Sequence, residues 1–284
     1  MPYKIVVCIK QVPDTENLTS KAMKEDGTVN RSALPAIVNP EDLNALEMAL
    51  QIKEEHGANV TVITMGPPSA TEALREALYR GADHVILLTD RKFAASDTLA
   101  TSYILSQGVR QTGQPDLVLC GRQAIDGDTA QIGPQLAEKL QYPQCTYADE
   151  ILNLTKDTIK VRRNLGQGYE ILESPLPALL TVTEEANEPR PPAAKKLMVH
   201  KKSQALCELE KSDDSEEDTE PTIDQWGAED IDCDLDRCGR SGSPTKVKKI
   251  ESVQLVSEEH ARIKPSLEGL SGLVRELIDE HIIE

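Results

Sequence analysis

The sequence predicts an α/β fold, a parallel doubly wound sheet with helices on both faces. Short apolar runs alternate with helical segments between residues 3 and 140, an order typical of βαβ units. The apolar runs are continuous instead of alternating with polar residues, which indicates strands that are covered on both faces. We expect strands at residues 3–9, 59–65, 84–89 and 116–120, with helices at about 39–57, 69–79, 96–111 and 135–140.

The first of these helices has the clearest boundaries. Asn39 suits an N-cap, Pro40 suits the first helical position, and Gly57 suits the end of the helix. A stripe of apolar residues between these limits predicts that one side of the helix packs on the sheet.

The pattern changes after residue 142. Runs separated by Gly and Pro predict strands at 158–163, 168–173 and 178–183. We interpret about 144–183 as a small antiparallel β appendage, or an extension of the sheet edge, in an α/β domain that spans residues 1–188. Residues 189–206 are rich in Pro and Lys, and we expect them to protrude as a docking loop.

The remaining chain divides into an acidic linker, residues 207–221, and a C-terminal arm, residues 222–284. In the arm we expect a helix start at 222–226, a turn at 243–245, a short strand at 247–250 and a final amphipathic helix. An apolar stripe on that helix predicts packing on a neighbouring element or on a partner; it comprises Leu267, Leu270, Leu273, Val274, Leu277 and Ile278.

Composition excludes several classes of protein. The chain has 284 residues and a formal charge of −17, which disfavours binding to nucleic acid or to anionic lipid. It contains no apolar run near the roughly 18 residues that span a bilayer. The N-terminus leads straight into a strand without the organisation of a signal peptide, so we expect a cytoplasmic protein. The six Cys and five His lack metal-ligand spacing, so we expect reduced structural thiols and no metal site.

The segment Gly121–Pro134 links an apolar strand to a helical pattern. Such a junction presents free backbone N–H groups and the positive end of a helix dipole, which together suit a nucleotide phosphate. Gly127 and Ala130 allow close approach of a ligand, and Asp128 and Gln131 have capping-box spacing. Pro134 predicts that the helix restarts near residue 133. From the residues alone, an ordinary capped turn explains the segment equally well.

Catalysis by side chains is not predicted. The loop carries Asp126 and Asp128, and Glu138 follows, but no matching His or nucleophile accompanies them. The two aspartates would repel a phosphate, so we assign them to caps or to ribose hydroxyls and leave the phosphate to backbone amides.

The loop and the Gln-Leu-Ala-Glu-Lys-Leu that follows it resemble the nucleotide-binding signature of the β subunit of electron transfer flavoproteins. The resemblance continues at residues 7–12, 39–40, 65–67, 176–183 and 187–190. It covers roughly residues 1–200, and the C-terminal third is similar only more loosely, through residues 243–245.

This resemblance implies a heterodimer with an α subunit that carries one FAD. The β subunit of this family holds AMP or, in the electron-bifurcating branch, a second FAD. A docking loop at about Pro189–Lys201 would contact a dehydrogenase or an acyl-CoA-type reductase. The implied cofactor-binding residues are Cys8, Asn39, Pro40, Glu41, Asp42, Met65, Gln123, Ala124, Ile125, Asp126, Gly127, Asp128, Thr129, Ala130, Gln131, Ile132, Gly133 and Pro134.

Departures from the housekeeping pattern favour the bifurcating branch. Gly127 and Ala130 are smaller than the residues of the AMP-type loop and leave room for FAD, and Ala194 stands where that type has a leucine anchor. Gly166 replaces a usual acid. The expected function is therefore transfer of electrons from NADH, through FAD, to ferredoxin and to a partner enzyme. A housekeeping β subunit that holds AMP and serves acyl-CoA dehydrogenases is the first alternative. A stand-alone adenine-nucleotide sensor is the second, and it would not need the docking loop or the final helix.

Overall fold

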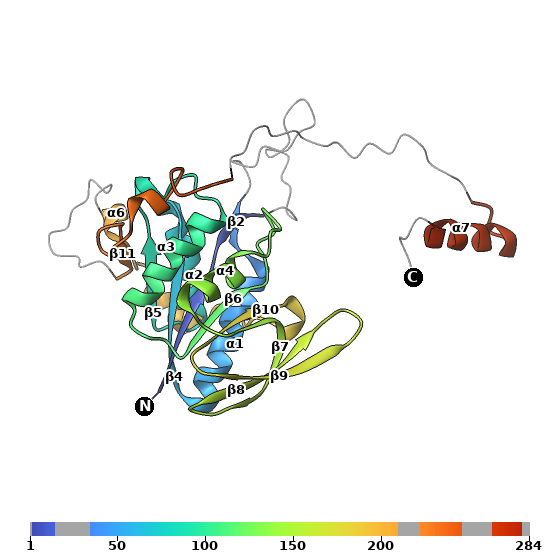
Figure 1. The fold of residues 1–284 in the computed structure, drawn as a ribbon, viewed down its shortest axis with the longest axis horizontal. Helices are drawn as coiled ribbons and strands as arrows, with labels where there is room; N and C mark the ends of the chain where they lie inside the picture. Colours follow the sequence, from blue (N-terminus) through green and yellow to red (C-terminus); the bar gives the residue numbers. More distant parts are fainter. Residues whose placement is uncertain (1, 15–34, 210–221, 246–262, 280–284) are drawn as a thin grey trace.

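The structure is a computed structural model that describes residues 2–14, 35–209, 222–245 and 263–279. Within these residues a nine-stranded sheet has the order β11-β5-β4-β1-β6-β10-β7-β8-β9 (Figure 1). Neighbouring strands from β11 to β7 pair in parallel, whereas β8 and β9 pair antiparallel. The predicted α/β class with a small antiparallel part is confirmed.

Most parallel strands are apolar and buried along their length. They are β1 (Tyr3–Cys8), β4 (Ala58–Met65), β5 (His84–Leu88), β6 (Leu117–Gly121) and β10 (Ala178–Val182). The short edge strand β11 (Asp224–Trp226) is more polar and partly exposed. The long strand β7 (Gln144–Leu154) pairs first with β10 and then with β8 (Thr158–Asn164), which pairs with β9 (Tyr169–Pro175). A separate antiparallel pair consists of β2 (Gln11–Pro13) and β3 (Ala36–Val38).

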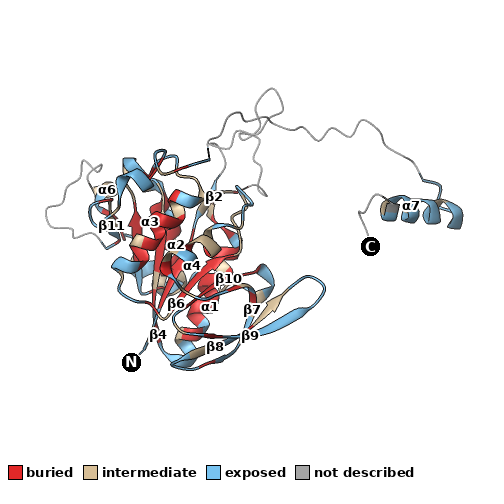
Figure 2. Ribbon diagram, in the orientation of Figure 1, coloured by how far each residue is buried: buried red, intermediate tan, exposed pale blue. Residues whose placement is uncertain are grey.

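Helices cover both faces of the sheet. The core on one face contains α1 (Pro40–His56) and α2 (Thr71–Arg80), and the core on the other contains α3 (Thr98–Gln111) and α4 (Ile132–Leu140). Figure 2 shows the buried residues of these layers in red. Short 3-10 turns are η3 (Pro68–Ala70), η4 (Arg91–Phe93), η5 (Glu184–Ala186) and η6 (Leu235–Arg237).

The strand order reverses at β1. Strands β4 and β5 follow on one side of it, whereas β6 and β10 lie on the other. Loops that leave the carboxyl ends of β1 and β6 therefore diverge, and ligands of open α/β sheets bind in such a crevice. The segment Gly121–Pro134 leaves β6 at this point.

Two sequence predictions about strands are wrong. Residues 178–183 do not belong to the antiparallel appendage, because β10 lies inside the parallel sheet between β6 and β7. Its five residues are all buried, as both faces of a central strand require. Residues 222–226 do not start a helix: β11 pairs in parallel with β5, and the burial of Ile223 overrides the local helical pattern.

The segment predicted to protrude is partly helical. Its residues Ala194–His200 form α5, which packs near α2, and Leu206–Leu209 form the short helix α6. The final amphipathic helix is confirmed as α7 (Leu267–Asp279). Most of the acidic linker and the strand predicted at 247–250 lie outside the described residues. None of the described helices combines the length and the apolar character needed to cross a membrane.

Candidate nucleotide-binding site

The start of α1 lies directly against the end of β6. A Cβ atom at Gly121 would come within 2.4 Å of Asp42 Oδ1 and 2.8 Å of the Asp42 backbone nitrogen. Real side chains do not tolerate such contacts, so this position requires glycine. The close approach brings the N-terminus of α1 to the loop Gly121–Pro134.

Three side chains at the start of α1 hold this loop. Asp42 Oδ1 accepts from the Gly121 amide at 3.0 Å, and Glu41 Oε2 accepts from the Gln123 amide at 2.8 Å. Asn39 donates to the Gln123 carbonyl at 2.8 Å and accepts from the Ile125 amide at 3.1 Å. Their side-chain polar groups therefore bind protein, and contact with a nucleotide through them stays a prediction. Pro40 is exposed at the same helix end.

Asn39 differs in one respect from the sequence prediction. It occupies the N-cap of α1, but its side chain makes no capping hydrogen bond. The amide group instead bridges to the loop from β6, a partner about 84 residues away that no local pattern reveals. Tertiary hydrogen bonds have replaced the local cap.

Burial changes the acidity of Asp42. Removal from solvent raises the pKa of its carboxyl to about 7, against the hydrogen bonds from Lys10, Asn39 and Gly121 that lower it. Asp42 also accepts from the Lys10 amide at 2.8 Å through Oδ2. One buried carboxyl thus joins the chain after β1, the start of α1 and the end of β6.

The predicted ligand residue Cys8 is buried at the end of β1, in the same core cluster as Cys120 of β6. Burial, with a smaller effect of Asp42, raises the pKa of the Cys8 thiol to about 12. Cys8 is therefore a neutral core side chain, and only its backbone is available to a ligand.

Lys10 is a site residue that the sequence prediction missed. Its ammonium contacts both oxygens of Asp126, at 2.6 and 2.7 Å. The pair joins the segment after β1 to the tip of the loop, so Asp126 does not cap a helix. Lys10 lies in residues 7–12, which resemble the family, and this motif is the sequence signal that could have identified it as a site residue.

The bend of the loop depends on residues other than glycine. Asp128 and Ala130 have φ of 47° and 51°, whereas Gly127 is not among the residues with positive φ. Left-handed backbone at non-glycine residues is uncommon and clusters at functional sites. A Cβ atom at Gly127 would meet nothing within 4 Å, so the space over this residue is open.

The predicted capping box is wrong. Helix α4 begins at Ile132 after Gln131, and no side chain caps it. The Gln131 amide oxygen instead accepts from Thr98 of α3 at 2.7 Å, and Asp128 accepts from Gln123 at 3.3 Å. The side chains of Gln131 and Asp128 therefore stabilise the loop and do not cap the helix.

The start of α4 presents unpaired backbone donors. Within the described residues, the amides of Thr129, Ala130, Gln131, Ile132 and Gly133 make no hydrogen bond to protein. Pro134 lies in the first helical turn, where a missing N–H costs nothing, which agrees with the predicted late start. These donors and the helix dipole suit an anion such as a phosphate.

Gly133 also has a packing role. A Cβ atom there would lie 2.3 Å from Thr181 Cγ2 and 3.1 Å from Cys120 Sγ. Glycine lets the first turn of α4 rest against β6 and β10, and so fixes the direction in which the free amides point.

The last predicted residue, Met65, lies at the carboxyl end of β4. It lines a cavity of about 400 Å³ with Gly66, Phe93 and residues that follow β5. This cavity opens at the same sheet edge as the loop and adds an apolar surface suited to a planar ring. The structure thus brings the loop and Met65 to one edge of the sheet. The side chains of residues 39, 41 and 42 support the loop.

These features are those of an α/β protein whose loop at the switch point of the sheet suits a nucleotide phosphate. The model of the electron transfer flavoprotein domain matches residues 26–206. The chain is 44% identical over 279 residues to "Electron transfer flavoprotein subunit beta" of Clostridium acetobutylicum, covering 98% of this chain and 99% of the relative.

Two other relatives are similar over their full length. "Caffeyl-CoA reductase-Etf complex subunit CarD" of Acetobacterium woodii is 42% identical, covering 99% of this chain and 100% of the relative. "Acryloyl-CoA reductase electron transfer subunit gamma" of Anaerotignum propionicum is 39% identical with the same coverage. The chain belongs to the electron transfer flavoprotein family and corresponds to its β subunit. Membership implies a flavin or AMP as ligand.

Proposed function

We propose that this chain is the β subunit of an electron-bifurcating flavoprotein and holds FAD at the switch-point site. NADH is the donor, and the acceptors are ferredoxin and, through the FAD of the α subunit, a partner dehydrogenase or reductase. FAD, when bound, accepts a hydride and releases electrons singly, which is chemistry that side chains lack.

The observation that carries the nucleotide part is the run of unpaired amides from Thr129 to Gly133. Two acids of the site are paired with cations and therefore do not oppose a phosphate there. Asp126 is neutralised by Lys10, and Glu41 is paired with Arg122 at 2.8 Å. The protein thus offers the phosphate backbone donors and directs its carboxylates to its own loop.

Two points favour FAD over AMP. The space above Gly127 is open, and the cavity beside Met65 offers apolar lining at the same sheet edge. The names of two relatives place them in reductase complexes, which supports a reductase as partner. The described part of α5 provides exposed apolar side chains for docking, with Met198 64% and Val199 67% exposed.

Purification of the complex with its α subunit and release of its cofactors tests this proposal. We expect two FAD per heterodimer and rapid reduction of one of them by NADH. One FAD with one AMP would overturn the FAD assignment and support the housekeeping alternative. A chain that binds nucleotide but no α subunit would support the sensor.

A variant at Gly127 separates these ligands further. Gly127→Asp places an acid in the open space above the loop, so we expect loss of most of the β-subunit FAD with retention of AMP. Gly168→Asp is the matched control, because a Cβ atom there also meets nothing within 4 Å. Equal FAD content in both variants would contradict the role of Gly127.

A further inference from the structure

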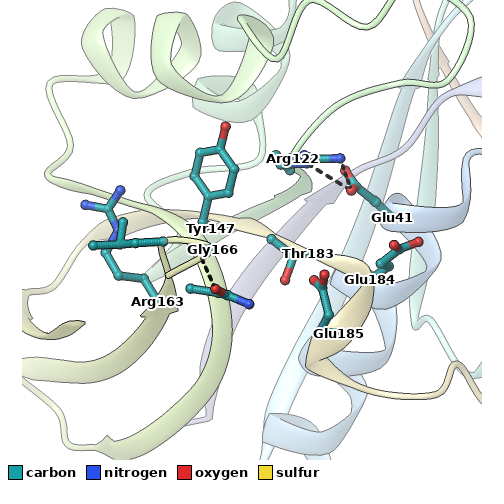
Figure 3. A pocket seen from close by; sticks show the side chains of 10 residues that line it. Glu41, Arg122, Tyr147, Arg163, Gly166, Thr183, Glu184 and Glu185 are labelled. Atoms are coloured by element: carbon teal, nitrogen blue, oxygen red, sulfur yellow. Dashed lines mark hydrogen bonds and ion pairs between the residues drawn. The ribbon is translucent and has the colours of Figure 1, made fainter. Parts of the chain in front are cut away.

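A second cavity, of about 460 Å³, opens on the other side of the Glu41–Arg122 pair. It lies where β6 and β10 end, beside the turn between β8 and β9 (Figure 3). We call it the Thr183 cavity. It shares only Glu41 and Arg122 with the elements of the nucleotide site.

Two residues that line the cavity carry buried polar atoms with no hydrogen-bond partner among the described residues. The Thr183 hydroxyl makes no hydrogen bond, although the residue is only 4% exposed. Arg163 Nε is likewise buried and unpaired, while Nη2 of the same side chain donates to Thr146 at 3.0 Å. Buried polar atoms without partners are rare in folded proteins, because each costs the free energy of its lost hydration. A ligand with both a donor and an acceptor would satisfy the two atoms.

The backbone beside the cavity is strained. Tyr147 has φ of 60°, which an aromatic side chain rarely adopts. The strain falls where the pairing of β7 with β10 shifts register, and the Tyr147 amide donates to Thr181 Oγ1 at 3.0 Å. This arrangement sets the Tyr147 ring at the cavity wall, with the Arg122 guanidinium 5.7 Å from its centroid.

The charged side chains that line the Thr183 cavity indicate which kind of ligand it binds. Arg122 is already paired with Glu41. Glu184 and Glu185 are exposed on η5, and neither side chain makes a hydrogen bond or a close ion pair with the described residues, while Glu185 interacts with Arg122 only electrostatically. Figure 3 shows both carboxylates beside Thr183. Because neither acid is in a close ion pair, the two carboxylates repel a phosphate and attract a cation, so the opening of the cavity suits a basic side chain.

We propose that the Thr183 cavity receives a polypeptide segment of the α subunit. A basic side chain of that segment pairs with Glu184 and Glu185, and its backbone accepts from Arg163 Nε and hydrogen-bonds the Thr183 hydroxyl. A polypeptide supplies the cation, the donor and the acceptor together, which a nucleotide does not. The identity of the partner rests on the proposed function, whereas the chemistry of the occupant rests on the cavity.

The test measures the affinity of the full chain for the electron transfer flavoprotein α subunit of the same organism. Replacing Glu184 and Glu185 together by Gln should weaken binding at least about tenfold and reduce its dependence on salt. Thr183→Val keeps the shape but removes the hydroxyl, and should weaken binding about three- to tenfold. Thr183→Ser keeps the hydroxyl and should bind the α subunit with the affinity of the wild type.

Controls distinguish docking from folding. Glu173→Gln removes an exposed acid of β9 that does not line the cavity, and should bind like the wild type. The free Thr183→Val chain should unfold at no lower urea concentration than the wild type, because the hydroxyl has no partner among the described residues.

Three outcomes would overturn the docking proposal. Unchanged affinity in the Thr183→Val and Glu184/Glu185 variants would overturn this proposal alone, while a wild-type chain that does not bind the α subunit would overturn the proposed function with it. Changed flavin content with unchanged affinity would assign the cavity to a cofactor, and would also overturn the docking proposal.

Discussion

At the scale of single residues, the carboxyls of Glu41 and Asp42 show how buried acids serve as structural supports. Both residues are buried, and they accept backbone N–H groups from Gly121, Gln123 and Lys10. Charge-assisted hydrogen bonds offset part of the cost of burial. The result is a loop whose base is fixed while its tip, residues 126–129, stays exposed.

Asp42 predicts a dependence of stability on pH. Its folded pKa of about 7 lies above the ordinary value of 3.8, so between these values the folded state binds more protons than the unfolded state. Stability therefore falls as the pH rises from about 4 to 7, by at most about 1.4 kcal/mol per pH unit, and then levels off. Relative to Asp42→Asn, the wild type should lose free energy of unfolding in this window.

Urea denaturation at several pH values between about 5 and 8 measures this difference. The variant has an absolute defect of its own, because an amide cannot accept from both Lys10 and Gly121 N–H groups with two oxygens. Only the change with pH tests the idea. A constant gap between wild type and variant would contradict it.

At the scale of elements, the segment after β10 is fastened to α1 before α5 begins. Asn44 and Asn187 exchange hydrogen bonds, with Asn44 Nδ2 2.7 Å from the Asn187 carbonyl. Arg190 then pairs with Glu47 at 2.7 Å and with Glu54 at 2.5 Å. These two acids raise the pKa of Arg190 further above its ordinary range. We call these contacts of Asn187 and Arg190 with α1 the latch. The latch fixes the chain just before α5, and the exposed side of α5 stays available to a partner.

Arg190→Gln should release this segment. The Glu47 side chain is 7% exposed, so its pair with Arg190 contributes more than an exposed ion pair does. We expect trypsin to cleave after Lys195 and Lys196 about tenfold faster, since loss of a charged hydrogen bond costs about 1.5–3 kcal/mol.

Glu54→Gln is the matched control, because the Glu54 side chain is 63% exposed and the Glu47 pair remains. It should change the cleavage rate little. Equal acceleration by both substitutions would show that the Glu47 pair is not the latch.

At the scale of the whole molecule, α7 presents an apolar stripe without a described partner. Leu267 is 87% exposed, and Leu270, Val274 and Ile278 are also exposed. An amphipathic helix with its apolar side in water is typical of an element that packs on another chain. We therefore propose that α7 packs on the α subunit, as the sequence predicted for this helix, whereas β11 of the same C-terminal arm belongs to the main sheet.

Leu270→Asp combined with Val274→Asp tests this packing. Affinity for the α subunit, measured by analytical ultracentrifugation, should fall at least about tenfold, because each buried aliphatic side chain contributes about 1.5–3 kcal/mol. The melting temperature of the free chain should not change. Gly272→Asp adds one negative charge away from the stripe, where a Cβ atom meets nothing within 4 Å among the described residues, and should bind normally. Loss of affinity in this control would contradict a specific role for the stripe.

Local patterns were sufficient for much of the fold. Continuous apolar runs predicted β1, β4, β5 and β6, since burial on both faces leaves no room for alternation. Gly57 marked the end of α1, and Pro134 predicted the late start of α4. The loop Gly121–Pro134 was located because a strand, a turn and a helix start follow one another in the chain.

Other features depend on residues that are distant in sequence. The place of β10 in the sheet, the strand β11 and the bridge from Asn39 to the loop are set by pairing across tens of residues. The sequence by itself determined the class of fold and the family, and it located the loop for which phosphate binding stays a prediction. Only the tertiary structure decided that residues 39, 41 and 42 support the loop and that Thr183 lies unpaired in a second cavity. The reason is physical: periodicity and caps act over a few residues, whereas burial and buried hydrogen bonds depend on which segments meet in space.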